Sequence, residues 1–278
     1  MRTVSLPKVM LTHAALIGAC AVVLYPVLWV IKMALSPSQA FSMSPNPIPT
    51  EVTLQNFVHL FTMQDGLLWR QLLNSIIVSG ATTLIGVILA STAAYAFSRF
   101  RFPGRTLGMA GFLITQMFPG VVMAIPLYIL LDKLGLLNSL TGLILVYSTS
   151  SLPFCVWMLK GYFDTIPRDL EEAAVMDGAS QWLIFTQIML PLARPAMVVT
   201  ALFSFMTAWN EFILAATFLT DDKMFTIPIV LQRFVGDYST QWGYFAAGAI
   251  LVSLPVMGLF FKLQKYLIGG LTAGAVKG

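Results

Sequence analysis

Few side chains in this sequence suit covalent or acid–base chemistry, and they are scattered along the chain. It has two histidines and two cysteines, His13, Cys20, His59 and Cys155. These four do not have the close spacing of metal ligands. Glu171 and Glu172 are adjacent, so in a helix their side chains diverge by about 100° and form no acid–base pair. No GxxxxGK[ST] nucleotide-binding loop occurs. We therefore expect no catalytic residue, no metal site and no cofactor bound by this chain.

The charged residues gather instead in one segment, residues 160–195, which lies between two apolar segments. Only 10% of the chain is charged. The eight charges of this segment are Lys160, Asp164, Arg168, Asp169, Glu171, Glu172, Asp177 and Arg194. A polar segment of this kind is better suited to docking against another protein than to catalysis.

Turn and cap residues predict two short helices in this segment. Pro167 suits the start of a helix, with Asp164 or Thr165 available as its cap and acidic residues in its first turn. Gly178 can adopt the left-handed conformation that ends such a helix, and Ser180 can cap the next one. We expect a helix–turn–helix at a membrane surface.

The elements around this segment are long, apolar and helical in pattern. Of the 278 residues, 58% are hydrophobic, and about 20 apolar residues are enough to cross roughly 30 Å of hydrocarbon. We predict an all-α transmembrane protein forming one membrane domain over residues 1–278. The expected spans are residues 9–31, 72–97, 106–131, 138–159, 195–219 and 242–261, with a polar loop at 160–194 and a tail at 262–278.

Basic residues give the predicted spans an orientation. Eleven of the 16 Lys and Arg residues fall in the two terminal tails, the loop after residue 97 and the loop 160–194, and five fall on the opposite face. Because cytoplasmic loops are enriched in Lys and Arg, we expect both termini and the polar loop to be cytoplasmic. The same rule accounts for the net charge of +4 without any nucleic-acid partner.

One carboxylate, Glu211, falls inside a predicted span, next to Asn210. A charged group within a bilayer costs a few kcal/mol, so it usually faces a bundle interior or a wet cavity. Two interpretations stay open. Asn210 and Glu211 line a solute pathway, or Glu211 is hydrated near the interface or paired structurally.

The polar segment carries a motif that resembles a known family. Its residues are Glu172, Ala173, Ala174, Gly178, Ile188, Leu190 and Pro191. In order and spacing they match the EAA motif of the permease subunits of bacterial ABC importers. Residues 209–215, WNEFILA, and 269–278, GGLTAGAVKG, resemble the MalG branch of this family, which belongs to maltose and maltodextrin transport.

The resemblance implies a type I importer permease with a MetI-like core of six helices, in which the motif residues form a cytoplasmic coupling loop. It implies a second, MalF-like permease, two copies of an ABC ATPase that binds the ATP and Mg, and a periplasmic or lipid-anchored sugar-binding protein. It also implies that the tail reaches the ATPase and that residues 220–241 contact the binding protein. The chain would lie in the bacterial inner membrane, among lipid.

Other functions remain open at this stage. Permeases for trehalose and other disaccharides or oligosaccharides share much of the pattern. A stand-alone, ion-coupled secondary transporter would need several intramembrane ionisable groups and an inverted repeat. A membrane enzyme would need convergent His, Asp or Ser groups within its spans. The sequence offers only Glu211 for the former and scattered residues for the latter.

Overall fold

The structure is a computed structural model that describes the backbone of residues 6–236 and 239–275, and the side chains as far as Tyr266. This part of the chain is helical, and its only extended pairing is an isolated bridge between Val235 and Thr240. The chain divides into two compact units. One comprises Met1–Trp69 with Val230–Leu254, and the other comprises Arg70–Ile229 with Pro255–Gly278. The absence of strands from the described residues agrees with the predicted all-α fold.

Several of the described helices are long and apolar enough to cross a bilayer. Four qualify singly: Leu6–Leu35, Gln55–Arg99, Leu140–Phe163 and Trp242–Tyr266. Two further spans are counted if each strongly bent pair of helices crosses as one: Arg105–Met117 with Gly120–Lys133, bent by 101°, and Gln181–Leu192 with Arg194–Asn210, bent by 75°. Length and composition therefore permit four to six spans, and the exact six-span arrangement stays a prediction.

The first unit is built from α1 (Leu6–Leu35), α2 (Gln55–Thr62), the one-turn segment Met63–Gly66 and the first part of α13 (Trp242–Ala275). α1 runs without a break through Pro26. The proline-rich loop after α1 is held by side chains. The Lys32 ammonium donates to the carbonyls of Ser44 and Asn46, and the Phe41 ring packs edge-on against Trp242.

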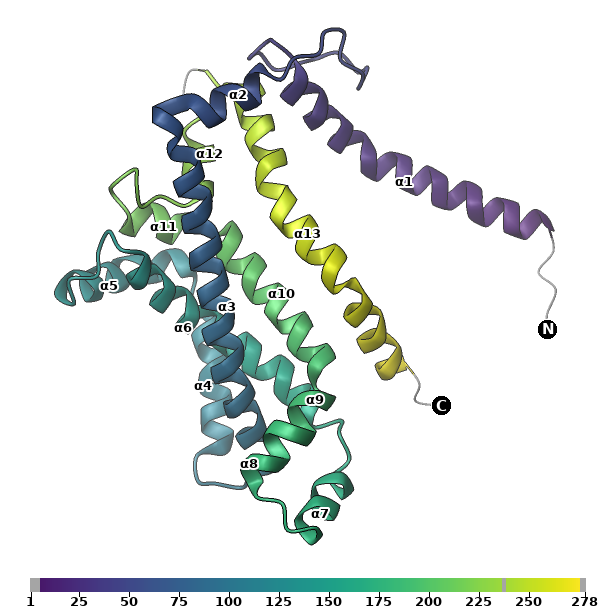
Figure 1. Cartoon of the computed structure of the whole chain (residues 1–278), viewed down its shortest axis with the longest axis vertical. Helices are drawn as coiled ribbons and strands as arrows, with labels where there is room; N and C mark the ends of the chain where they lie inside the picture. The colour runs from purple at the N-terminus through teal and green to yellow at the C-terminus, as the bar shows by residue number, and fades with distance from the viewer. Residues whose placement is uncertain (1–5, 237–238, 276–278) are drawn as a thin grey trace. The chain divides into compact units, whose positions relative to one another are not determined.

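The second unit contains most of the helices, and Figure 1 shows how they follow one another. In chain order they are α3 (Leu67–Arg99), α4 (Arg105–Met117), α5 (Gly120–Lys133), α6 (Leu140–Phe163), α7 (Asp169–Met176), α8 (Gln181–Ile184), the π-helical turn Phe185–Met189, α9 (Leu190–Leu192), α10 (Arg194–Asn210), α11 (Ile213–Phe218), α12 (Ile227–Gln232) and the last part of α13. A break at Pro119 separates α4 from α5, because proline cannot continue the hydrogen-bond ladder.

Small residues of α3 allow the core of this unit to close. Ala90 and Ala94 are fully buried and lie in one cluster with Val156 and Leu159 of α6 and with Met189. Small side chains let helix backbones approach closely, which is how helices associate where lipid removes the hydrophobic driving force. This cluster joins the end of α3 to the segment that carries α7 and α8.

Amide side chains fix the loop after α11 to the same unit. The Asn74 side chain donates to the carbonyls of Lys223 and Phe225 at 2.9 and 3.0 Å, and Gln71 donates to Asp222 at 3.0 Å. Asn138, in a left-handed conformation with φ of 51°, accepts from the backbone of Thr220. Residues 218–227 are therefore tied to α3 and to the start of α6.

We predict opposite effects for two glycine-to-alanine changes in α6. A Cβ on Gly142 would overlap the Leu136 carbonyl, whereas a Cβ on Gly161 meets nothing within 4 Å. Gly142→Ala should therefore destabilise the fold by about 1–3 kcal/mol through overpacking. Gly161→Ala should leave stability unchanged or raise it, because Ala is the better helix former. Thermal unfolding of both variants in one detergent tests this, and an equal loss for the two would contradict the packing at Gly142.

Candidate functional site

The polar loop between α6 and α10 forms a helical hairpin, α7 and α8, at the end of the second unit where α3 ends (Figure 1). Gly178 has φ of 83° and ends the first turn after α7, as predicted. Ser180 Oγ accepts from the Leu183 amide at 3.3 Å and caps α8, also as predicted. The predicted cap of α7 is wrong, because the N-cap position is Arg168 and neither Asp164 nor Thr165 bonds to the helix.

An ion pair attaches this hairpin to α3. Arg99 Nε bonds to Glu171 Oε1 of α7, and the exposed fractions of the two side chains are 7% and 13%. Arg99 Nη2 also donates to the Ile166 carbonyl at 2.9 Å, just before α7. The Tyr95 hydroxyl, one turn earlier on α3, donates to Glu171 Oε2 at 3.0 Å. Both oxygens of Glu171 are thus bound, which satisfies a nearly buried carboxylate.

A second carboxylate, Asp164, ties the end of α6 to the same place. Ser98 Oγ donates to it at 2.6 Å and Lys160 Nζ donates at 2.6 Å. Burial by itself raises the pKa of Asp164, but these hydrogen bonds and the positive charges of Lys160 and Arg99 outweigh it and leave the pKa below its ordinary value. A lowered pKa stabilises the fold above the unfolded value near 4 and loses this effect as the pH falls through the folded pKa.

The structure separates the motif residues onto two sides of α7. Glu172 and Ala173 are exposed, and the described residues make no hydrogen bond to the Glu172 carboxylate. Ala174 is half-buried and packs on the core that includes Tyr95 and Phe185. Adjacent helical residues differ by about 100°, which is why Glu171 points inward while Glu172 points outward. One acidic residue holds α7 in place and the next is left available to a partner.

The outward side of the hairpin combines bare apolar groups with acidic ones. Met176, the last residue of α7, has an exposed fraction of 87%, and Trp182, in α8, has one of 69%. The carboxylates of Glu172 and Asp177 lie on the same exposed hairpin. A large aromatic and a flexible thioether beside charges are typical of protein contact surfaces. We name Glu172, Met176, Asp177 and Trp182 the hairpin surface.

The last three motif residues position the hairpin rather than face outward. Ile188 and Leu190 are half-buried against the core, and Ile188 lies in the π-helical turn Phe185–Met189. Pro191 lies at the start of α9, just before the 75° bend into α10. π-turns are rare and frequently occur at functional sites. This bend, with Pro191 beside it, sets the direction of the hairpin relative to the start of α10.

Sequence reasoning missed the residues that hold the hairpin, namely Tyr95, Arg99 and Glu171. The available signal was an arginine at the end of a predicted span, which served only to orient the protein. Glu171 had been considered as one charge of the polar segment and as half of an unsuitable acid–base pair, not as the partner of Arg99. Local spacing gives no information on a contact 72 residues apart in sequence.

Asn210 and Glu211 lie at the break between α10 and α11. Asn210 is exposed and its side chain donates to the Met206 carbonyl at 2.8 Å. Glu211 accepts from the amides of Leu214 and Ala215 at 2.9 and 3.0 Å and from the Tyr147 hydroxyl. The carboxylate therefore stabilises the first turn of α11 and has a structural partner. Whether these two residues line a solute pathway stays a prediction.

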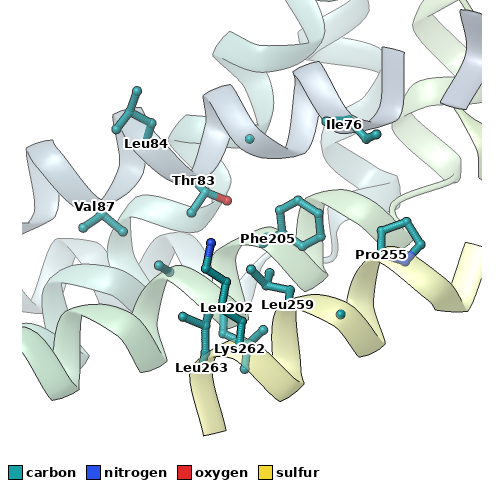
Figure 2. Close-up of a pocket in the computed structure, with 13 residues that line it drawn as sticks. Ile76, Thr83, Leu84, Val87, Leu202, Phe205, Pro255, Leu259, Lys262 and Leu263 are labelled. Carbon is teal, nitrogen blue, oxygen red and sulfur yellow. The ribbon is translucent and has the colours of Figure 1, made fainter. Parts of the chain in front are cut away.

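A groove of about 610 Å³ on the second unit differs from a sugar site in its chemistry. Figure 2 shows apolar side chains of α3, α10 and α13 around it, such as Leu84, Phe205 and Leu259, with the Lys262 ammonium as a charged exception. Sugar hydroxyls need precisely placed polar partners. This groove offers only Lys262 and Thr83, whose hydroxyl donates to the Ser79 carbonyl. The described residues also include no cluster of three metal-ligating side chains.

We predict that breaking the Arg99–Glu171 pair costs far more than breaking the outer pair. Arg99→Ala leaves a nearly buried carboxylate without its charge partner, and such changes cost about 3–5 kcal/mol. Lys160→Ala breaks a more exposed pair, with exposed fractions of 20% and 42%, and should cost less than about 1 kcal/mol. Thermal unfolding in one detergent compares the two variants. Equal losses would contradict the role of Arg99 in holding α7.

Comparison with known proteins places this fold in a family. Residues 82–268 match the family model described as binding-protein-dependent transport system inner membrane component. The chain is 37% identical over 273 residues to the galactooligosaccharides transport system permease protein GanQ of Bacillus subtilis, covering 98% of this chain and 96% of that protein. It is 36% identical over 279 residues to the trehalose/maltose transport system permease protein MalG of Thermococcus litoralis, covering 100% of both.

The solved structures agree on the fold. A chain of a bacterial ABC transporter involved in import of the acidic polysaccharide alginate superposes with a TM-score of 0.78 at 22% identity, covering 96% of this chain and 99% of that one. The resemblance drawn from the motif at residues 172–191 is thereby confirmed. The chain belongs to the binding-protein-dependent transport system inner membrane component family, as a multi-pass permease of an ABC importer.

Proposed function

We propose that this chain is one of two permease subunits of an ATP-driven sugar importer, and that the α7–α8 hairpin is its contact with the ATPase. The partners are a second, MalF-like permease, two copies of the ATPase and a sugar-binding protein. ATP and Mg bind to the ATPase, and this chain carries no catalytic residue. Both termini and the hairpin face the cytoplasm, because that side has the excess of Lys and Arg.

The proposal rests on the different roles of the two sides of α7: the inner side is held and the outer side is exposed. Arg99 and Tyr95 hold Glu171 on the inner side, so α7 moves with the end of α3. The outer side presents the hairpin surface, with Met176 and Trp182 as apolar anchors. An ATPase that closes around this surface transmits its motion to a transmembrane helix through an ion pair rather than through a loose loop. ATP then shifts the population of the two membrane states by binding them unequally.

The substrate is proposed to be a neutral oligosaccharide, and maltose and maltodextrin are the first candidates. The relatives named above are permeases for galactooligosaccharides and for trehalose and maltose, at similar identity. The runner-up is therefore a trehalose or other disaccharide importer. The tail residues 269–278, which suggested the maltose branch, lie outside the described side chains.

We predict that the two neighbouring glutamates of α7 have different roles: Glu172 acts in transport and Glu171 in stability. Glu172→Gln should leave the unfolding temperature unchanged and lower sugar-stimulated ATP hydrolysis and uptake at least about tenfold, because charge-assisted hydrogen bonds contribute about 1.5–3 kcal/mol. Glu171→Gln should lower the unfolding temperature, because it removes the partner of Arg99. The readouts are thermal unfolding and uptake in proteoliposomes with the ATPase and binding protein present. Full uptake by Glu172→Gln would contradict the docking assignment.

The composition of the complex tests the function directly. We expect mild-detergent purification of the tagged chain from its native membrane to recover a second permease and an ATPase, identified by mass spectrometry. ATP hydrolysis stimulated by the binding protein is then compared for maltose, maltodextrins, trehalose and galactooligosaccharides. Recovery of the chain alone, with transport in liposomes without ATP, would instead establish a stand-alone transporter.

A further inference from the structure

The apolar groove between α3, α10 and α13 of the second unit contains a single charged side chain, that of Lys262 (Figure 2). The residues that line it are otherwise apolar or glycine, except Thr83. The Thr83 hydroxyl already donates to the Ser79 carbonyl at 2.7 Å. Lys262 forms no ion pair and no hydrogen bond with the described residues. An apolar surface and an unneutralised cation thus lie side by side.

Lys262 lies where α13 leaves the hydrocarbon of a bilayer. The 20 residues from Trp242 to Phe261 carry no charge and directly precede it. At about 1.5 Å per residue they span about 30 Å, which is the thickness of the hydrocarbon core. The Lys262 ammonium is therefore level with lipid headgroups. From there the groove runs back into the hydrocarbon, past Leu259 to Pro255.

The length of the groove matches one leaflet of the bilayer. Along α3 it extends from Ile76, at the end near Pro255, to Val87, at the end near Lys262 (Figure 2). Eleven residues of helix correspond to about 16 Å. Half of the hydrocarbon core is about 15 Å. A lipid tail that starts beside Lys262 therefore reaches the other end of the groove at the middle of the bilayer.

We propose that this groove binds an acyl chain of an anionic phospholipid, whose phosphate pairs with Lys262. The two parts of the lipid are complementary to the two parts of the groove, apolar to apolar and negative to positive. Basic pockets between transmembrane helices on the cytoplasmic side bind anionic headgroups in this way. Only the choice of the cytoplasmic leaflet depends on the orientation proposed above, and the binding itself does not.

A helix of another subunit fits the groove less well than a lipid tail. A helix about 10 Å across and 16 Å long occupies roughly 1,200 Å³. The groove has a volume of about 610 Å³, so about half of such a helix would remain outside it. An apolar helix would also leave the Lys262 charge without a partner at the edge of the bilayer, where a phosphate neutralises it. A narrow, flexible acyl chain has neither disadvantage.

Native mass spectrometry tests the role of the charge. The chain is purified in mild detergent with the subunits that accompany it, and phosphatidylglycerol or phosphatidylethanolamine is added. We expect the anionic phosphatidylglycerol to bind several-fold more tightly. Lys262→Gln should weaken phosphatidylglycerol binding about fivefold, which is the contribution of one lysine near an anionic surface. Phosphatidylethanolamine binding should not change.

Lys265→Gln is the matched control for the charge. It removes the same charge from an exposed residue of the same helix that does not line the groove. We expect this variant to bind phosphatidylglycerol as the unaltered chain does. Equal losses in the two variants would show attraction to the basic tail as a whole and overturn the proposal. The comparison needs only the phospholipid, so its outcome is independent of whether an ATPase accompanies the chain.

A bulky side chain in the groove tests the position of the acyl chain. A Cβ meets no atom within 4 Å on Gly258, which lines the groove, or on Gly111 of α4, which does not. Gly258→Phe should therefore fold, as thermal unfolding checks, and weaken phosphatidylglycerol binding several-fold. Gly111→Phe should retain it.

Two results with these glycine variants would overturn the proposal. Unchanged phosphatidylglycerol binding by Gly258→Phe would show that the acyl chain lies elsewhere. Loss of a co-purifying permease from Gly258→Phe, but not from Gly111→Phe, would show that a protein helix fills the groove.

Discussion

The Arg99 guanidinium joins the end of α3 to a region distant in sequence, where it bonds both to the residues just before α7 and to α7 itself. A charge that is nearly removed from water must have fixed partners, and a planar guanidinium can bind several at once. Its position at the end of α3 therefore decides where the hairpin lies. Tyr95 contributes the second bond to Glu171 and packs its ring against Phe185 at 5.0 Å, so the same contact is both polar and apolar.

A second constraint shapes the apolar helices, because backbone groups inside a bilayer have no water to bond. Breaks in a span need local substitutes for the lost helical bonds. At the break after α10, the Glu211 carboxylate supplies them by accepting from Leu214 and Ala215. The Tyr147 hydroxyl donates to the same carboxylate and completes its surroundings. The Arg99 and Glu211 sites, at opposite ends of the helices, thus both satisfy polar groups that are removed from water.

These features give the permease a hairpin that is firmly attached on its inner side and exposed on its outer side. α7 is fixed on its inner side by an ion pair and by Ala174 in the core, while Met176 and Trp182 are left bare. A surface of this kind gains affinity from a partner that covers it, without itself rearranging. The π-turn and the 75° bend before α10 direct the hairpin away from the bundle. Under the proposed function, motion of the ATPase would reach α3 and α10 through these short connections.

The sequence by itself determined the helical class, the membrane character, the hairpin with its Gly178 turn and Ser180 cap, and the family. Those properties depend on composition, on apolar length and on contacts between residues close in the chain. It did not determine which glutamate of α7 is held or why Glu211 is tolerated. These depend on side chains that are 60 or more residues apart, such as Arg99 with Glu171 and Tyr147 with Glu211. Only tertiary packing brings such pairs together, because burial, and not local spacing, requires each charge to find a partner.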